Sequence, residues 1–120
     1  MRKLRISLLG VVATAFVLAV AVPAMAAPKS HAGTTVTVTG SEFKFVLSAA
    51  SVPHGTVTFN FKNAGALPHD FSINGKATPV IAGKKSASLT VTFAKAGSYA
   101  YSCTVPGHAA AGMKGTLKVT

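Results

Sequence analysis

From Thr34 to the C-terminus, the chain is built of short runs in which apolar and polar residues alternate. Alternation with a period of two is typical of a strand that buries one face. Turn residues such as Asn74-Gly75 separate the runs roughly every ten positions, and no segment shows a helical period. The pattern predicts a single all-β domain, an antiparallel β-sandwich of seven to eight strands. The expected strands lie within residues 34–39, 43–47, 56–62, 71–73, 89–93, 99–103 and 115–119.

The first 26 residues have the composition of a secretory signal peptide. Three of the first five residues are Arg or Lys, and residues 6–22 are almost entirely apolar. Ala24 and Ala26 satisfy the small-residue rule for cleavage, so we expect cleavage after Ala26. Residues 27–120 would then be exported through the general secretory route to the periplasm or the cell exterior. Because the apolar segment is long, an uncleaved membrane anchor is the competing interpretation.

The chain is strongly basic. It contains 12 Lys and Arg residues against two acidic residues, Glu42 and Asp70. The lysines are spread along the chain and do not alternate with aromatic residues, which argues against nucleic-acid binding. The charge indicates solubility and steering toward an acidic partner protein or an anionic surface, such as that of a membrane. A basic surface that is merely solvated is the alternative.

Cys103 is the only cysteine, so a disulfide within the chain is excluded. A lone thiol in an oxidising compartment is a liability unless it is buried or bound to a metal. His108 and Met113 follow at intervals of five residues, and the turn pair Pro106-Gly107 precedes His108. One loop between two strands can therefore direct a thiolate, an imidazole and a thioether at one point. His69, at the start of an expected strand, is the best candidate for a second imidazole.

This combination of side chains indicates the metal. Two imidazoles and a thiolate with a weak axial thioether suit copper, whereas zinc rarely accepts methionine. Each residue alone is a weak signal, because a single Cys or Met is usually buried core and a single His usually has another role. Their joint spacing is far more specific, and we assign neither His31 nor His54 to the metal. The sequence predicts one mononuclear type 1 copper site formed by His69, Cys103, His108 and Met113.

The segment from Tyr101 to Gly115 resembles the cupredoxins, small blue-copper proteins of the plastocyanin, azurin and auracyanin type. The segment from Gly55 to Asn63, followed by Pro68-His69, is similar to the strand that carries the first histidine ligand in that family. The resemblance covers nearly all of residues 34–120. It implies a Greek-key β-sandwich, a buried type 1 copper and one-electron transfer between larger redox partners. It also implies that His108 lies near the surface as the exit for the electron.

The sequence departs from the family pattern after the first histidine. The family often has Asn at this position, and this chain has Asp70. We expect Asp70 to accept a hydrogen bond from the Thr104 hydroxyl, and its charge to favour the oxidised metal and lower the potential. A solvated aspartate at a strand edge is the alternative. Residues 65–68 and 109–111 are small or apolar, and we expect them to form a flat rim around His108.

These features predict an exported, monomeric carrier of single electrons rather than an enzyme. Four histidines cannot supply the additional histidine-rich copper site of multicopper oxidases, and two acids cannot form the usual hydrolytic arrangements. The main alternative is an exported copper chaperone or resistance protein that delivers copper to a cuproenzyme, although such proteins typically lack a cysteine ligand. A metal-free adhesion module is the remaining alternative.

Overall fold

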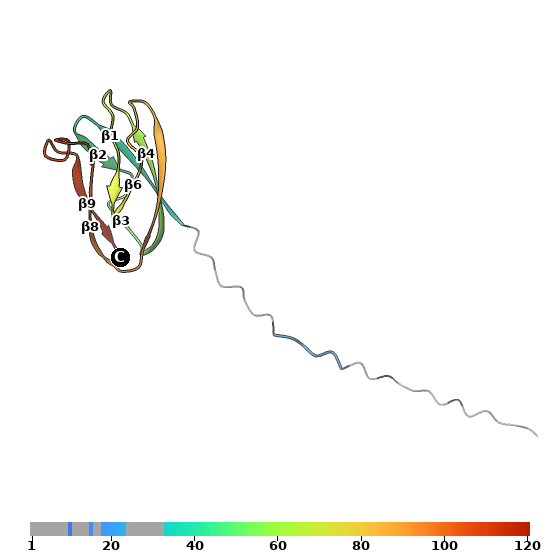
Figure 1. Ribbon diagram of the computed structural model, residues 1–120. Coiled ribbons are helices and arrows are strands. Elements are labelled where there is room, and N and C mark those ends of the chain that lie inside the picture. The colour runs from blue at the N-terminus through green and yellow to red at the C-terminus, as the bar shows by residue number, and fades with distance from the viewer. Residues whose placement is uncertain (1–9, 11–14, 16–17, 24–32) are drawn as a thin grey trace, which may run out of the picture. The chain divides into compact units, whose positions relative to one another are not determined.

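The computed structural model describes Gly10, Ala15 and residues 18–23 and 33–120, and the last of these ranges forms a two-layered β-sandwich (Figure 1). The predicted all-β sandwich is confirmed, with nine strands and no helix between residues 33 and 120. The number exceeds the seven to eight expected because two further strands, Ser51–Val52 and Lys76–Ala77, span only two residues each, too few for alternation to reveal them. In chain order the strands are β1 (Thr34–Ser41), β2 (Lys44–Leu47), β3 (Ser51–Val52), β4 (Gly55–Asn63), β5 (Ser72–Ile73), β6 (Lys76–Ala77), β7 (Ser86–Phe93), β8 (Gly97–Ser102) and β9 (Lys114–Val119).

The chain divides into two units, Met1–Ser30 and His31–Thr120. The residues described in the first unit have no regular secondary structure. Most of the predicted signal peptide, residues 1–26, lies outside the described residues, as does His31, so cleavage after Ala26 stays a prediction. Within the described part of the chain, no helix has the length and apolar character needed to cross a membrane.

The strands are divided between a four-stranded sheet of order β2-β1-β4-β7 and a five-stranded sheet of order β3-β9-β8-β5-β6. The pairing is mixed rather than purely antiparallel, because β1 is parallel to β4 and β3 is parallel to β9. Alternation reports which face of a strand is buried and not the direction of its neighbour, so the sequence pattern could not reveal this. The chain passes repeatedly between the sheets, as in a Greek key, and this brings distant strands together in parallel.

The core lies between the two sheets, where the apolar residues of the alternating runs meet. Strand β4 shows the pattern most clearly, since Val57, Phe59 and Phe61 are buried while Thr56 and Asn60 are exposed. Burying a phenylalanine side chain contributes roughly 1.5–3 kcal/mol to the free energy of unfolding. Four phenylalanines therefore contribute much of the stability, and each is fully buried: Phe59, Phe61, Phe71 and Phe93.

The two tyrosines of β8 pack against this core, as the sequence predicts. The ring centroid of Tyr99 lies 4.7 Å from that of Phe93, and the centroid of Tyr101 lies 5.6 Å from that of Phe71. Tyr101 also covers Gly115 of β9, where a Cβ atom would lie within 2.5 Å of the ring atom Cζ. These contacts fix the strand that leads directly to Cys103.

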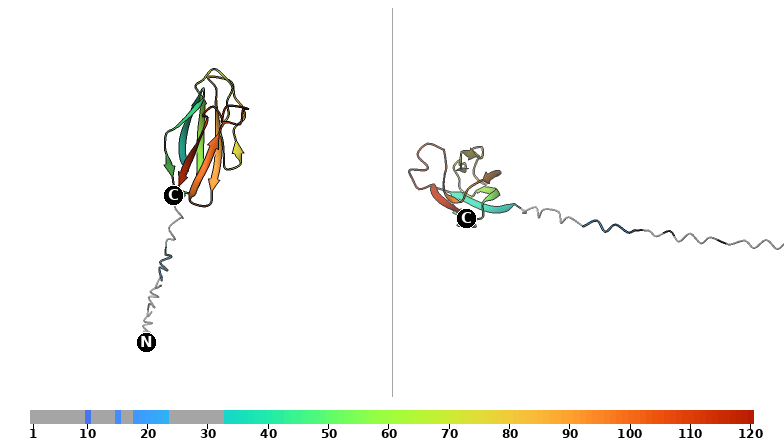
Figure 2. Two further views of the ribbon diagram at one scale, coloured as in Figure 1. Left: turned by 90° about the vertical axis from the view of Figure 1, so that its left-hand side faces the viewer. Right: turned by 90° about the horizontal axis from the view of Figure 1, so that it is seen from below.

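The loops that carry the candidate ligands gather at one end of the sandwich. Gly40 pairs with Asn63 and Lys62 pairs with Ser86, so β1 and β4 end where β7 begins. The C-terminus and the pairs Gly55–Phe93 and Gly97–Val119 define the opposite end (Figure 2). The rigid layers between these ends hold the loops in place.

Candidate metal centre

His69 follows β4 in a segment held by main-chain and side-chain hydrogen bonds. Its backbone exchanges two hydrogen bonds with Ile81, at 3.1 and 2.9 Å. The amide of Asn63 donates to the carbonyl oxygens of Leu67 and Ile81, and its own oxygen accepts the Gly65 N–H. His69 is fully buried. These hydrogen bonds hold the segment that carries His69 in place.

Cys103 and Met113 lie at the two ends of the loop between β8 and β9. The Cys103 N–H donates to the Met113 carbonyl at 3.0 Å, and the Met113 N–H donates to the His108 carbonyl at 3.1 Å. The loop turns at Gly107 and Gly112, whose positive φ angles of 84° and 126° favour glycine. Cys103 and Met113 are buried and His108 is half-buried. The Pro-Gly turn that the sequence predicts is thus present.

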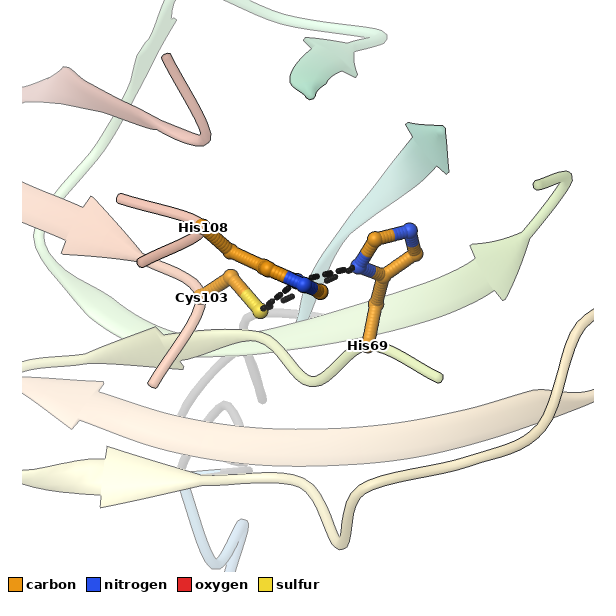
Figure 3. A group of neighbouring side chains, drawn as sticks. All are labelled: His69, Cys103 and His108. Atoms are coloured by element: carbon orange, nitrogen blue, oxygen red, sulfur yellow. Dashed lines mark hydrogen bonds between the residues drawn. The ribbon is translucent and has the colours of Figure 1, made fainter. Parts of the chain in front are cut away.

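Three of the four predicted ligands bring their donor atoms together (Figure 3). The Nδ1 atoms of His69 and His108 are 3.0 Å apart, and the Cys103 Sγ atom lies 4.0 and 3.7 Å from them, respectively. All three donor atoms lie within 4.8 Å of one another. The buried Met113 is linked to Cys103 by a backbone hydrogen bond. Two imidazoles, a cysteine sulfur and a methionine match the residue set of a type 1 copper site.

The environment of Cys103 couples metal binding to proton release. Burial raises the pKa of the Cys103 thiol above its usual value. A metal binds the thiolate rather than the thiol. Binding must therefore displace the thiol proton, which makes the metal affinity depend on pH.

Asp70 links the segment of His69 to that of Cys103. It is buried, and its carboxylate accepts hydrogen bonds from the Thr104 N–H at 2.6 Å and from the Thr104 hydroxyl. The expected bond to Thr104 is confirmed, and the alternative of a solvated aspartate is wrong. The effect of Asp70 on the potential stays a prediction.

Glu42 is the functional candidate that sequence reasoning missed. It lies in the turn between β1 and β2, and its Oε1 atom accepts hydrogen bonds from the Ala66 N–H, the Leu67 N–H and His69 Nε2, at 2.9, 2.8 and 3.1 Å. The Leu67 N–H is the main cause that lowers the pKa of Glu42 to about 2, against the opposing effect of desolvation. The only available signal in the sequence was the scarcity of acids, since Glu42 and Asp70 are its two acidic residues. In the structure, Glu42 contacts His69 and Asp70 directly follows it.

The surface next to His108 is apolar, as predicted. Leu67 and Ala110 are exposed, and the Phe43 and His108 rings pack in a T-shaped arrangement with their centroids 5.1 Å apart. Phe43, which is 38% exposed, extends the rim beyond the residues that the sequence indicated. His54 takes no part, since its Nδ1 contacts the Thr120 carbonyl oxygen at the other end of the sandwich.

Fold and site together define a cupredoxin-like copper protein. Residues 10–119 match the family model described as a cupredoxin-like domain, and the chain therefore belongs to this family. No curated protein sequence matches the chain.

Solved structures of auracyanins are similar to the chain over most of its length. An auracyanin B structure has 27% sequence identity and a TM-score of 0.65, covering 72% of this chain and 88% of that one. Dithionite-reduced auracyanin from Roseiflexus castenholzii has 25% identity and a TM-score of 0.64, covering 73% and 98%. Auracyanin A, a "blue" copper protein from Chloroflexus aurantiacus, has 26% identity and a TM-score of 0.62, covering 73% and 99%. The expected class of site, type 1 copper, agrees with this fold and residue set.

Proposed function

We propose that the chain holds one copper ion and carries single electrons between redox proteins. The observation that supports this most directly is the convergence of two imidazole nitrogens and one cysteine sulfur within 4.8 Å at one end of a cupredoxin fold. Bound copper would supply a one-electron couple between Cu(II) and Cu(I). The residues that would hold it are His69, Cys103, His108 and Met113.

The chain supplies a rigid, water-excluding enclosure for this couple. His69, Cys103 and Met113 are buried, and hydrogen bonds of the surrounding loops fix their backbones. A site that cannot rearrange between oxidation states allows fast electron transfer. His108 is the half-buried member of the set, so it provides the shortest route from the site to a partner.

A carrier accounts for the site better than an enzyme or a copper chaperone does. Within residues 33–120, His69, Cys103 and His108 make the only group of three or more His, Cys, Asp or Glu residues arranged to bind a metal. A copper chaperone must release its copper to another protein, and buried ligands on loops held by hydrogen bonds would hinder that release. An exported copper chaperone or resistance protein remains the second candidate, and reversible redox cycling without copper loss distinguishes the two.

The surface favours partners with an acidic docking face. Both acidic side chains are engaged at the site, Asp70 with Thr104 and Glu42 with the loop before His69. The other charged side chains between residues 33 and 120 are exposed lysines. An apolar rim with lysines beyond it suits brief contact with an acidic protein. We further propose that residues 1–26 direct export to the periplasm or cell exterior, and that residues 27–120 act as a monomer.

The decisive experiment adds Cu(II) to the purified protein and records its visible absorption and electron spin resonance spectra. An intense blue or green thiolate-to-copper band with narrow hyperfine splitting is expected, and Cys103→Ser should remove it. A matched Ser102→Ala variant, altered next to the cysteine, should keep the band. A colourless protein or a weak tetragonal copper signal would overturn the proposed function.

A further inference from the structure

One oxygen of the Glu42 carboxylate, whose side chain is 31% exposed, accepts hydrogen bonds from three donors beside the buried His69 ring. Glu42 lies 27 positions before His69 in the sequence, yet its Oε1 atom accepts from the His69 ring nitrogen Nε2 and from two consecutive backbone amides, those of Ala66 and Leu67. The two amides belong to the segment that leads into His69. Glu42 therefore holds both the histidine ring and the loop that carries it.

We propose that Glu42 is a positioning residue for the metal site, which fixes the tautomer of His69 and places a negative charge one imidazole ring away from the metal. The effect of the charge on the metal rests on the proposed copper function, whereas the tautomer of His69 does not. Glu42 adds a residue from the β1–β2 turn to a site otherwise built from the loops that carry His69 and Cys103.

The tautomer follows from the chemistry of the contact. A carboxylate only accepts hydrogen bonds, so the His69 Nε2 atom must carry the proton. The Nδ1 atom then presents its lone pair, and this is the atom that faces Cys103 and His108. His69 is fully buried, so solvent does not compete for the ring. A carboxylate on the far nitrogen of a ligating histidine also increases the basicity of the ring.

The chain makes room for this carboxylate. A Cβ atom on Gly65 would lie 2.3 Å from Glu42 Oε1, and one on Gly83 would lie 2.5 Å from the Gly65 carbonyl oxygen. Both positions therefore exclude larger side chains at the present backbone positions. Among the described residues, the only basic group within ion-pair distance of Glu42 is His69 itself. No lysine of the described residues therefore pairs with this carboxylate, and its one charged or titratable partner is the His69 ring.

The simpler explanation is that Glu42 only anchors the loop through the two backbone amides. The two explanations differ in what the charge does. Because all three hydrogen bonds end on one oxygen, Glu42→Gln can keep every acceptor contact and remove only the charge. A loop anchor would function equally well as glutamine, whereas a charged positioning group would not.

The first test measures the reduction potential of the copper-loaded protein. For Glu42→Gln we expect an intact blue site in which Cu(I) is favoured about tenfold more than in the parent protein, a rise of about 59 mV for one electron. Ala94→Lys, an exposed change at the opposite end, adds the same increment of charge and should shift the potential far less. Equal potentials for Glu42→Gln and the parent protein would overturn the electrostatic part of the proposal.

The second test needs no copper. Nitrogen-15 NMR of the metal-free protein should show His69 protonated at Nε2 and unprotonated at Nδ1, and Glu42→Ala should produce a mixture of tautomers. A proton on Nδ1 in the parent protein, or an unchanged tautomer in Glu42→Ala, would overturn the positioning role. A parent protein without a blue spectrum would instead refute the proposed function, while the NMR result would still decide the role of Glu42.

Discussion

Asp70 and Thr104 are joined by two hydrogen bonds, one from the backbone amide and one from the hydroxyl of Thr104, each to a different carboxylate oxygen. Asp70 follows His69 and Thr104 follows Cys103, so the pair locks the two candidate ligand segments together. The same contact places a buried negative charge close to the site. Asp70 therefore both joins the two segments and supplies a negative charge, and a substitution can remove the charge while keeping the hydrogen bonds.

Asp70→Asn should raise the reduction potential and leave the geometry intact. The asparagine oxygen can accept the Thr104 N–H, and its amide can donate to the Thr104 hydroxyl oxygen, so both contacts survive without the charge. We expect the equilibrium to shift roughly tenfold toward Cu(I), which raises the reduction potential by about 59 mV, measured by voltammetry. Thr104→Val is the matched control, because it removes one hydrogen bond and retains the charge. If Thr104→Val shifts the reduction potential and Asp70→Asn does not, the hydrogen bond and not the charge sets the potential.

Gly112→Ala should loosen the loop that carries His108 and Met113. Gly112 has a φ of 126°, and an added Cβ would lie 2.8 Å from the Phe43 carbonyl oxygen. Strain of this kind costs about 1–3 kcal/mol. We expect a lower unfolding temperature in the metal-free protein and weaker copper binding, measured by calorimetry and by competition with a chelator. Ala110→Ser, an exposed change in the same loop, is the control. Equal stability for the Gly112 variant and the parent protein would contradict the rigid-loop argument.

The proximity of these side chains could be predicted from their spacing, because one loop carries three of the four candidate ligands. Cys103, His108 and Met113 are local in sequence, and a strand end, a Pro-Gly turn and a following strand suffice to bring their backbones together. His69 could be inferred because Pro68-His69 precedes a strand in a predicted sandwich. Burial of the alternating valines and phenylalanines likewise follows from the pattern.

The parts that escaped prediction depend on long-range contacts. The parallel pairing of β1 with β4 arises from the route of the chain between two sheets, which periodicity does not encode. Glu42 reaches His69 across 27 positions, and nothing in its own neighbourhood marks it as part of the site. Phe43 follows Glu42 and joins the rim for the same reason. A side chain far from the ligands in sequence can be recognised as part of the site only from the folded structure.

The apolar rim should control the rate of electron exchange and not the binding of copper. Leu67 is 43% exposed, Ala110 is exposed, and each lies in a loop that carries one of the two histidines. A glutamate at either position would keep a partner at a distance, so Leu67→Glu and Ala110→Glu should slow electron self-exchange while the blue band stays unchanged. Ala94→Glu at the opposite end is the charge-matched control. Rates equal to that of the control in both variants would refute a docking role for the rim.

The excess of lysines should appear as a salt dependence whose direction depends on the charge of the redox partner. Eight lysines in the described residues are exposed, and Lys44 and Lys114 lie at the strand ends next to the site. Opposite charges attract within a Debye length of about 10 Å at 0.1 M salt. Electron exchange with anionic hexacyanoferrate should therefore slow as salt is added, and exchange with cationic hexaammineruthenium should accelerate. Lys114→Gln should weaken both responses, whereas Lys95→Gln, at the opposite end of the sandwich, should leave them nearly unchanged. Rates that are independent of salt for both probes would mean that the basic surface is merely solvated and does not steer partners.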